Sequence, residues 1–167
     1  MSKTSTSLCS TSKFGLSNMS GTRKLLKCFC NCSELTIEEV KRIYRLSAQE
    51  TLINREACLL FHKFLEKEQT GDSSEAKQLL EIYKKCDEYI INIHERIFTS
   101  DEVEELSALG LEYSHEKDLS KEVRTGDLYK IEMCLRRIQG KCRNRIECSD
   151  EYSKFKEAVL QKIRNAD

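Results

Sequence analysis

Two amphipathic segments joined by a short polar turn constrain the fold of this chain more than any other feature. In residues 54–68 the apolar side chains recur at intervals of three and four, which is the stripe of an α-helix: Ala57, Leu60, Phe61, Phe64 and Leu65. A polar turn follows at residues 69–74, and the helical period then runs from Ala76 to Ile93. Each stripe needs an apolar partner, and the short turn makes the two helices neighbours. The sequence therefore predicts an antiparallel helix pair within an all-α fold.

Composition favours a compact multi-helix bundle of about seven helices. The 167 residues include no Pro and only six Gly, and runs rich in Val, Ile and Thr, which favour strands, are nearly absent. The net charge is zero, so no general field attracts nucleic acid or an anionic membrane. No apolar run approaches the roughly 18 residues of a membrane span, and the first residues lack the apolar run of a secretory signal. We expect a cytoplasmic protein.

The chain is expected to divide into a tail and one domain. Residues 1–33 are rich in Ser, Thr and Cys and carry no periodic apolar stripe, so they are predicted to form a disordered N-terminal tail. Residues 34–167 are predicted to form the helical bundle domain.

Local signals predict where several helices begin and end. The pairs Thr36–Glu39 and Thr99–Glu102 each predict a capping box at a helix start. Other helices are expected to begin after polar caps: Asn54, Asp72 or Ser73, Asp127 and Ser149. Glycine is predicted to end helices at Gly126 and Gly140, which leaves residues 141–145 as a basic loop.

A cysteine-rich stretch precedes the first predicted helix. Its three cysteines alternate with other residues beside Lys and Arg side chains: Cys28, Cys30 and Cys32. One interpretation is a linker with reduced thiols. A second is acylation (palmitoylation), because an acyl chain and a basic patch together supply the two signals of stable peripheral membrane attachment. A third is a metal site, although Cys-x-Cys spacing strains tetrahedral coordination and no fourth ligand is near.

The sequence contains no constellation that predicts catalysis or a cofactor. It has no Gly-rich phosphate loop, no paired metal-ligand helix and no Ser or Cys beside a matched His, and His62 and His94 are interpreted as structural. The densest basic cluster lacks interleaved aromatic residues that could stack on bases: Arg136, Arg137, Lys141, Arg143 and Arg145. We therefore predict a protein-binding module without cofactor, metal or nucleic acid, and not an enzyme.

The order of these patterns resembles a divergent RGS domain, the helical domain of regulators of G-protein signalling. Residues 61–68 resemble the family's Phe-x-x-Phe-Leu-x-x-Glu helix, and residues 74–77 stand at its Ser-Glu-Glu-Asn turn. Residues 86–89, Cys-Asp-Glu-Tyr, resemble the family's Cys-Glu-(Asp/Glu)-Tyr. Residues 150–155, Asp-Glu-Tyr-Ser-Lys-Phe, are similar to its Asp-Ser-Tyr-x-Arg-Phe, and the resemblance covers residues 35–163. Family members are often held at membranes by cysteine-rich basic tails.

The resemblance implies a face that docks on the switch regions of an activated Gα subunit. Such domains add no catalytic group and speed GTP hydrolysis by holding the GTPase's own residues in place. The residues at the corresponding positions are Glu75, Lys77, Asp150 and Lys154. Lys77 replaces the family's turn Asn, Lys154 replaces its Arg, a second contact Asn falls near Gly110, and Asp150 is the one outright match. The family's central Trp is absent.

Two alternatives belong to other functional classes. A small helical adaptor with no GTPase partner would need an exposed apolar patch, for which the weakly periodic segment offers Leu109, Leu111 and Tyr113. A metal-dependent enzyme is the third interpretation.

Overall fold

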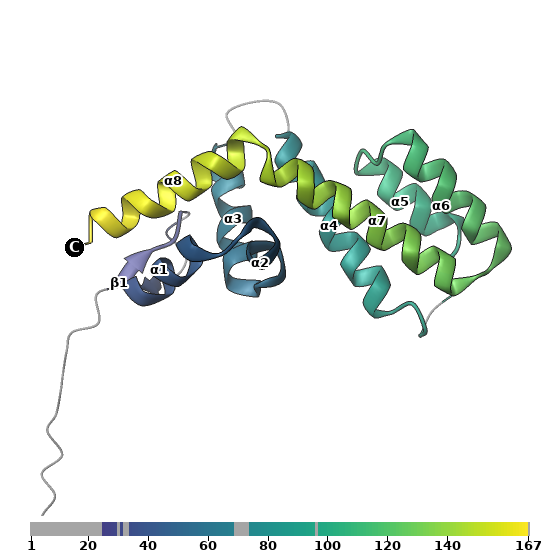
Figure 1. Cartoon of the computed structure of the whole chain (residues 1–167), viewed down its shortest axis with the longest axis horizontal. Coiled ribbons are helices and arrows are strands. Elements are labelled where there is room, and N and C mark those ends of the chain that lie inside the picture. The colour runs from purple at the N-terminus through teal and green to yellow at the C-terminus, as the bar shows by residue number, and fades with distance from the viewer. Residues whose placement is uncertain (1–24, 30, 32–33, 69–73, 96, 167) are drawn as a thin grey trace, which may run out of the picture.

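The computed structural model describes residues 25–29, 31, 34–68, 74–95 and 97–166 (Figure 1). A two-stranded sheet is followed by eight helices in this part of the chain. The strands are β1 (Leu25–Lys27) and β2 (Glu34–Thr36), and the helices are α1 (Ile37–Arg45), α2 (Ala48–Ile53), α3 (Arg55–Glu68), α4 (Glu75–Ile91), α5 (Ser100–Ala108), α6 (Tyr113–Thr125), α7 (Leu128–Glu147) and α8 (Asp150–Arg164). The predicted all-α multi-helix bundle is confirmed.

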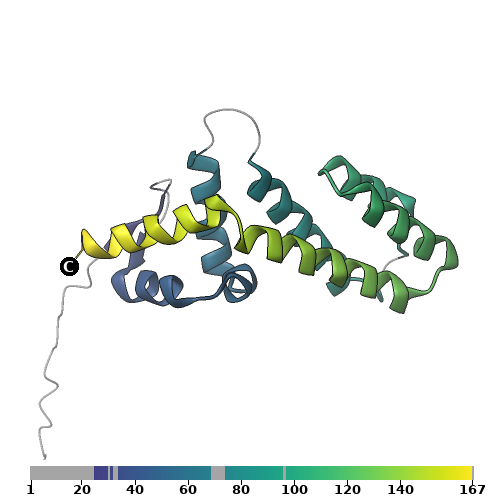
Figure 2. The ribbon, with the colours of Figure 1, turned by 45° about the horizontal axis from the view of Figure 1, so that its top comes forward.

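The helices form two groups that lie end to end (Figures 1 and 2). One group holds the β1–β2 hairpin, α1, α2, α3 and α8, and the other holds α4 to α7. Helix α7 packs along α4 and against α6, and it also contacts α2 and α8. Because α8 then packs on α1 and α3, the last two helices join both groups.

An aromatic cluster fills the core of the first group. The ring of Phe61 lies 5.5 Å from that of Tyr152 and 5.0 Å from that of Phe155. Phe64 completes the contact between α3 and α8, with its ring centroid 5.7 Å from that of Phe155. The whole predicted stripe of α3 is buried, as the helical period required.

The second group is centred on the buried faces of α4 and α7. Tyr89 is fully buried and packs edge-on against Phe98, with ring centroids 5.2 Å apart. The apolar residues of α7 continue one stripe along all 20 residues of the helix: Ile131, Cys134, Leu135, Ile138, Cys142 and Ile146. This stripe faces α4 and α6 and explains why α7 packs against both.

Most predicted helix starts are confirmed by hydrogen bonds. The capping boxes Thr36–Glu39 and Thr99–Glu102 are both formed. Asn54, Asp127 and Ser149 accept hydrogen bonds from backbone N–H groups in the first turns of their helices. The cap of α4 is Ser74, and the predicted caps Asp72 and Ser73 lie outside the described residues.

One helix was missed, and one predicted helix end is wrong. Helix α2 was not expected, although Ser47 and Glu50 form a capping box of their own at its start. Gly140 does not end a helix, and the predicted basic loop at residues 141–145 is the last part of α7. The apolar stripe explains this continuity, because Cys142 and Ile146 extend it past the glycine.

The predicted tail boundary is also wrong for its described part. Leu25–Lys27 forms β1, paired antiparallel with β2, and Cys28 and Phe29 are buried in the core. Lys162 of α8 closes this hairpin, because its Nζ donates to the Lys27 carbonyl oxygen at 2.8 Å and lies 4.8 Å from the Phe29 ring centroid. An aromatic contact and a cross-strand ladder therefore replace the expected disorder.

Candidate docking face

Three connections of the fold approach one another where α7 ends. They are the start of α4, the turn between α5 and α6 at residues 109–112, and the junction of α7 with α8. Side-chain contacts of Arg145, Ser74 and Glu151 link these three places. We call this surface the docking face and define it by Ser74, Glu75, Gly110, Glu112, Arg145, Asp150 and Glu151.

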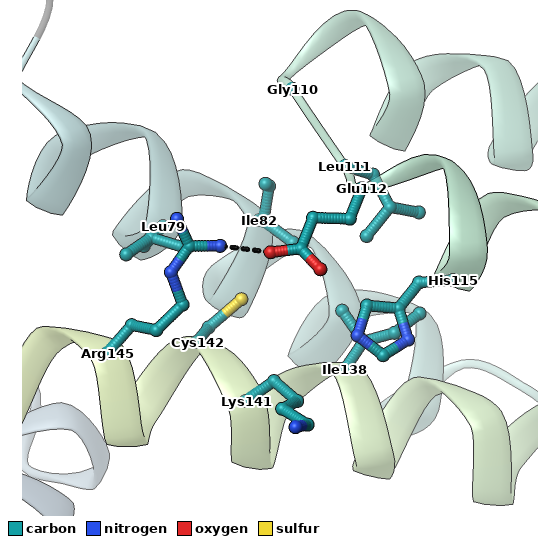
Figure 3. Close-up of a pocket in the computed structure, with 10 residues that line it drawn as sticks. All are labelled: Leu79, Ile82, Gly110, Leu111, Glu112, His115, Ile138, Lys141, Cys142 and Arg145. Carbon is teal, nitrogen blue, oxygen red and sulfur yellow. Dashed lines mark hydrogen bonds and ion pairs between the residues drawn. The ribbon is translucent and has the colours of Figure 1, made fainter.

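Arg145 is the central cation of the docking face. Its Nη2 donates to Glu75 Oε1 at 2.6 Å, and its Nη1 pairs with Glu112 Oε1 (Figure 3). The hydrogen bond to Glu75 raises the pKa of the guanidinium above its ordinary value, so the group is charged at every physiological pH. One planar fork thus bridges the first residue of α4 and the residue before α6.

A second contact joins the starts of α4 and α8. The Ser74 hydroxyl donates to Glu151 Oε1 at 3.2 Å, and Ser74 Oγ accepts from the Lys77 backbone N–H at 3.3 Å. Ser149 caps α8 by accepting from the Tyr152 N–H at 3.1 Å. The two helix starts therefore lie together at the surface, each with its own polar cap.

The turn between α5 and α6 is held from below. Gly110 takes a φ of +95°, which favours glycine, and Leu111 turns inward and is buried. The Gly110 N–H donates to the Ser107 carbonyl at 2.9 Å, and the Leu111 N–H donates to the Leu106 carbonyl at 3.1 Å. Gly110 itself stays exposed next to the start of α4.

A small pocket lies beneath the Arg145–Glu112 pair (Figure 3). Its floor is apolar and comes from α4, α7 and the turn between α5 and α6: Leu79, Ile82, Leu111, Ile138 and Cys142. The cavity measures about 20 Å³, which is room for about one water molecule. Burial raises the pKa of the Cys142 thiol to about 11, so the thiol is neutral at pH 7. The pocket is too small to take a partner's side chain while Arg145 covers it.

The four residues predicted to bind a partner lie on α4 and α8. Glu75 is exposed and paired with Arg145, and Lys77 is half-buried in the first turn of α4. Asp150 and Lys154 are exposed and four residues apart, so they share one side of α8. The structure therefore brings Glu75 and Asp150 to adjacent helix starts, while Lys154 lies one turn further along α8.

The structure bears differently on the cysteines predicted to be acylated and on the residues predicted to form an adaptor patch. Cys28 is 2% exposed, which contradicts acylation at this residue, because an acyl chain cannot be accommodated on a thiol inside the core. Cys30 and Cys32 lie outside the described residues. Leu111 is buried and Leu109 is packed against the core, so of the predicted apolar patch only Tyr113 is exposed.

The arginines of the predicted basic cluster bind different acidic or amide side chains. Arg136 pairs with Glu132 at 2.7 Å, Arg137 pairs with Asp118 at 3.1 Å, and Arg143 donates to Gln49 at 3.2 Å. His62 bridges α3 and α4 through Glu81, 2.8 Å from its Nε2. Within the described ranges no three His, Cys, Asp or Glu side chains are placed to hold a metal ion.

Sequence reasoning did not assign roles to Arg145 and Glu112. Arg145 was counted within the basic cluster, and Glu112 carried no motif. Their contacts join positions 33 and 70 residues apart in the chain, so no local pattern could reveal them.

Comparisons with known proteins add no relative. No family model matches this chain, and neither a curated protein nor a solved structure matches it. Among the helices of the described ranges, none has the length and apolar character needed to cross a membrane.

Proposed function

We propose that the chain is an RGS-like domain that docks on the switch regions of an activated Gα subunit and speeds or modulates its GTP hydrolysis. One observation carries this proposal. The three segments to which the resemblance assigns docking contacts are the start of α4, the turn at Gly110 and the start of α8, and they share one face around Arg145. They are far apart in the sequence, so an accidental match of helical patterns gives no reason for them to meet.

The docking face suits stabilisation of a mobile partner and offers no chemistry of its own. Its charged groups are carboxylates at helix starts and Arg145 in the last turn of α7. The Cys142 thiol beneath Arg145 is buried and neutral. Glu75 and Asp150 can accept hydrogen bonds from backbone N–H groups of a switch segment. Holding such a segment still preorganises the GTPase's own water-positioning and charge-stabilising residues, which lowers the barrier without an added catalytic group.

The direct test is single-turnover GTP hydrolysis by representatives of the main Gα classes, with and without the full chain. We expect faster hydrolysis by at least one class and tighter binding to the GDP–aluminium fluoride form than to the GDP form, because the latter lacks the activated switch arrangement. If no Gα subunit shows either effect, the proposal is wrong.

Membrane attachment is a separate part of the proposal. We propose that acylation at Cys30 or Cys32, beside the basic residues of the N-terminal segment, holds the protein at a membrane surface. The Cys30→Ser/Cys32→Ser variant should leave the membrane fraction of cells that express it. Cys148→Ser, which changes an exposed cysteine of the bundle, is the matched control. Equal partition of both variants would contradict acylation.

The adaptor alternative has lost its original motivation, because Leu111 is buried and Leu109 is packed against the core. A different surface keeps it testable. Tyr129 and Met133 are 72% and 50% exposed near the start of α7, whereas Arg145 of the docking face lies in its last turn. If Tyr129→Ser/Met133→Ser abolishes binding to a partner that is not a G protein, the adaptor interpretation is favoured.

A further inference from the structure

Arg145 connects two segments of the docking face through ion pairs with Glu75 and Glu112. Its guanidinium lies between Glu75, the first residue of α4, and Glu112, the residue before α6. In Figure 3 the Arg145 side chain rises from α7 and meets the Glu112 carboxylate above the apolar floor of the pocket. The pair therefore spans the gap between α7 and the turn at residues 109–112.

Glu112 is positioned for this contact and not for a local one. It stands at the N-cap of α6, where a short polar side chain would normally accept a backbone N–H, yet its side chain makes no cap hydrogen bond. The carboxylate reaches Arg145 on another helix. The Glu112 side chain thus binds Arg145, 33 residues away, and does not cap its own helix. This departure from the usual capping pattern indicates that holding the turn in place is important for function.

The turn itself presents backbone to the solvent. Gly110 is exposed with a positive φ, and Leu111 below it fixes the turn to the core. Leu111 anchors the inner side of the turn, and the Arg145–Glu112 pair anchors its outer side. Gly110 has no side chain to offer a partner, so any contact there depends on where the backbone is held.

We infer that Arg145 is a positioning residue, which holds the turn at residues 109–112 and the start of α4 in the arrangement that a partner meets. This role rests on the proposed docking function. Arg145 acts through Glu112 and Glu75 and does not itself contact the Gα subunit. The benefit is preorganisation, because a turn already fixed in its bound position loses less conformational entropy on binding.

The first experiment uses the free protein and is independent of any partner. We expect Arg145→Met to speed amide hydrogen exchange at Gly110, Leu111 and Glu112 while the thermal unfolding midpoint stays unchanged. Arg143→Met is the matched control, because Arg143 lies on the same helix and donates to Gln49 of α2. Arg145→Lys keeps the charge but not the fork, so intermediate exchange is expected. Unchanged exchange at all three amides overturns the inference.

The second experiment measures GTP hydrolysis at increasing concentrations of the chain. We expect Arg145→Met to raise the half-maximal concentration about threefold to tenfold, because the turn must then be ordered on binding. The rate at saturation should not change, because Arg145 touches neither the nucleotide nor the switch. A fall in the saturating rate with an unchanged half-maximal concentration overturns the positioning role.

A double-mutant cycle separates positioning from direct contact. If Arg145 acts through Glu75 and Glu112, then Arg145→Met should have a much smaller effect in a Glu75→Gln/Glu112→Gln background than alone. An equal effect in both backgrounds would mean that Arg145 contacts the Gα subunit directly, and the inference would be wrong. If the unaltered chain affects no Gα subunit, the proposed function fails, and the exchange experiment alone decides whether Arg145 positions the turn.

Discussion

The ring of Phe29 packs edge-on against the ring of Phe64, with centroids 5.2 Å apart and an interplanar angle of 68°. Phe155 lies 6.2 Å from Phe29, so the three rings join the N-terminal hairpin, α3 and α8. Residues that carry no periodic stripe thus belong to the same core as the most strongly patterned helix of the chain.

Phe64→Ala should be strongly destabilising. Phe64 is buried between Phe29 and Phe155, and truncating a buried Phe to Ala costs about 3–5 kcal/mol. Urea denaturation gives the measurement. Leu59→Ala, at a position of α3 that is 52% exposed, is the control, and it should change stability by less than about 0.5 kcal/mol. A loss below about 1 kcal/mol for Phe64→Ala would contradict its place in the core.

Cys28→Ser should destabilise the protein, contrary to what a tail would allow. The thiol is buried beside Phe29, and placing a hydroxyl in an apolar site costs about 1–3 kcal/mol. The exposed Cys148→Ser serves as control, with an expected change within about 0.5 kcal/mol. Equal denaturation midpoints for the two variants would show that the hairpin does not pack on the core in solution.

Gly140→Ala should stabilise the protein by about 0.5–1 kcal/mol, because alanine has the higher helix propensity. Gly140 lies inside α7, and a methyl group there would meet no atom within 4 Å. Gly126→Ala gives the opposite sign, since Gly126 has a φ of +68° at the end of α6, and a left-handed Ala costs about 1–2 kcal/mol. A destabilising Gly140→Ala would indicate that α7 is interrupted there.

Acid should weaken the contact between α4 and α5 through Glu105. The Tyr89 hydroxyl donates to Glu105 Oε2 at 2.5 Å and Lys85 lies 3.0 Å from it, and these contacts lower the pKa of the carboxyl. The folded state therefore binds this proton less readily than the unfolded state, so the contribution is complete above the unfolded pKa. It disappears as the pH falls below 4.5 and through the folded value.

Glu105→Gln tests this linkage. Between about pH 5 and pH 3, the loss of stability should be smaller in the variant than in the unaltered protein. The neighbouring exposed Glu104→Gln is the control and should follow the unaltered protein. Parallel stability curves for Glu105→Gln and the unaltered protein would exclude a contribution from this carboxylate.

Asp150→Asn separates a helix-start role from a docking role. As an exposed acid at the first position of α8, Asp150 should contribute about 0.3–1 kcal/mol to folding through the helix dipole. Under the docking proposal, the variant should also lose at least about tenfold in affinity for an activated Gα subunit, or about 1.4 kcal/mol. Asp101→Asn, an exposed acid in the first turn of α5, is the matched control. Unchanged affinity in folded Asp150→Asn would leave it a helix-start residue only.

The elements that could be predicted from sequence are those determined within a few residues. A capping box such as Thr36–Glu39 joins positions three apart, and the stripe of α3 repeats every turn, so both are visible in a short window. Helix α2 has the same capping-box signal at Ser47 and Glu50, but the helix is only six residues long, which is too short to show a periodic stripe. Gly140 is a residue that commonly ends helices, but here the tertiary packing of Cys142 and Ile146 overrides that tendency.

The docking face was predictable only in part. Its residues on α4 and α8 came from a resemblance of short motifs, which places Glu75 and Asp150 but not their neighbours. Arg145 was visible only as one of several cations, because its acidic partners come from distant parts of the chain. The burial of Cys28 could not be predicted from sequence for the same reason. The neighbouring Lys27 backbone binds Lys162, which lies 135 residues later in the chain.

The contact between Lys162 and the Lys27 carbonyl has a consequence for the order of folding. Helices α4 to α7 follow one another in the sequence and pack mainly on one another, so they can assemble as soon as α7 has left the ribosome. The hairpin and α1 to α3 have no such independence, because Phe155 and Lys162 of α8 close their core. The hairpin and α1 to α3 are therefore synthesised first but completed last. Until α8 has been synthesised, the aromatic side chains of this group are exposed to chaperones.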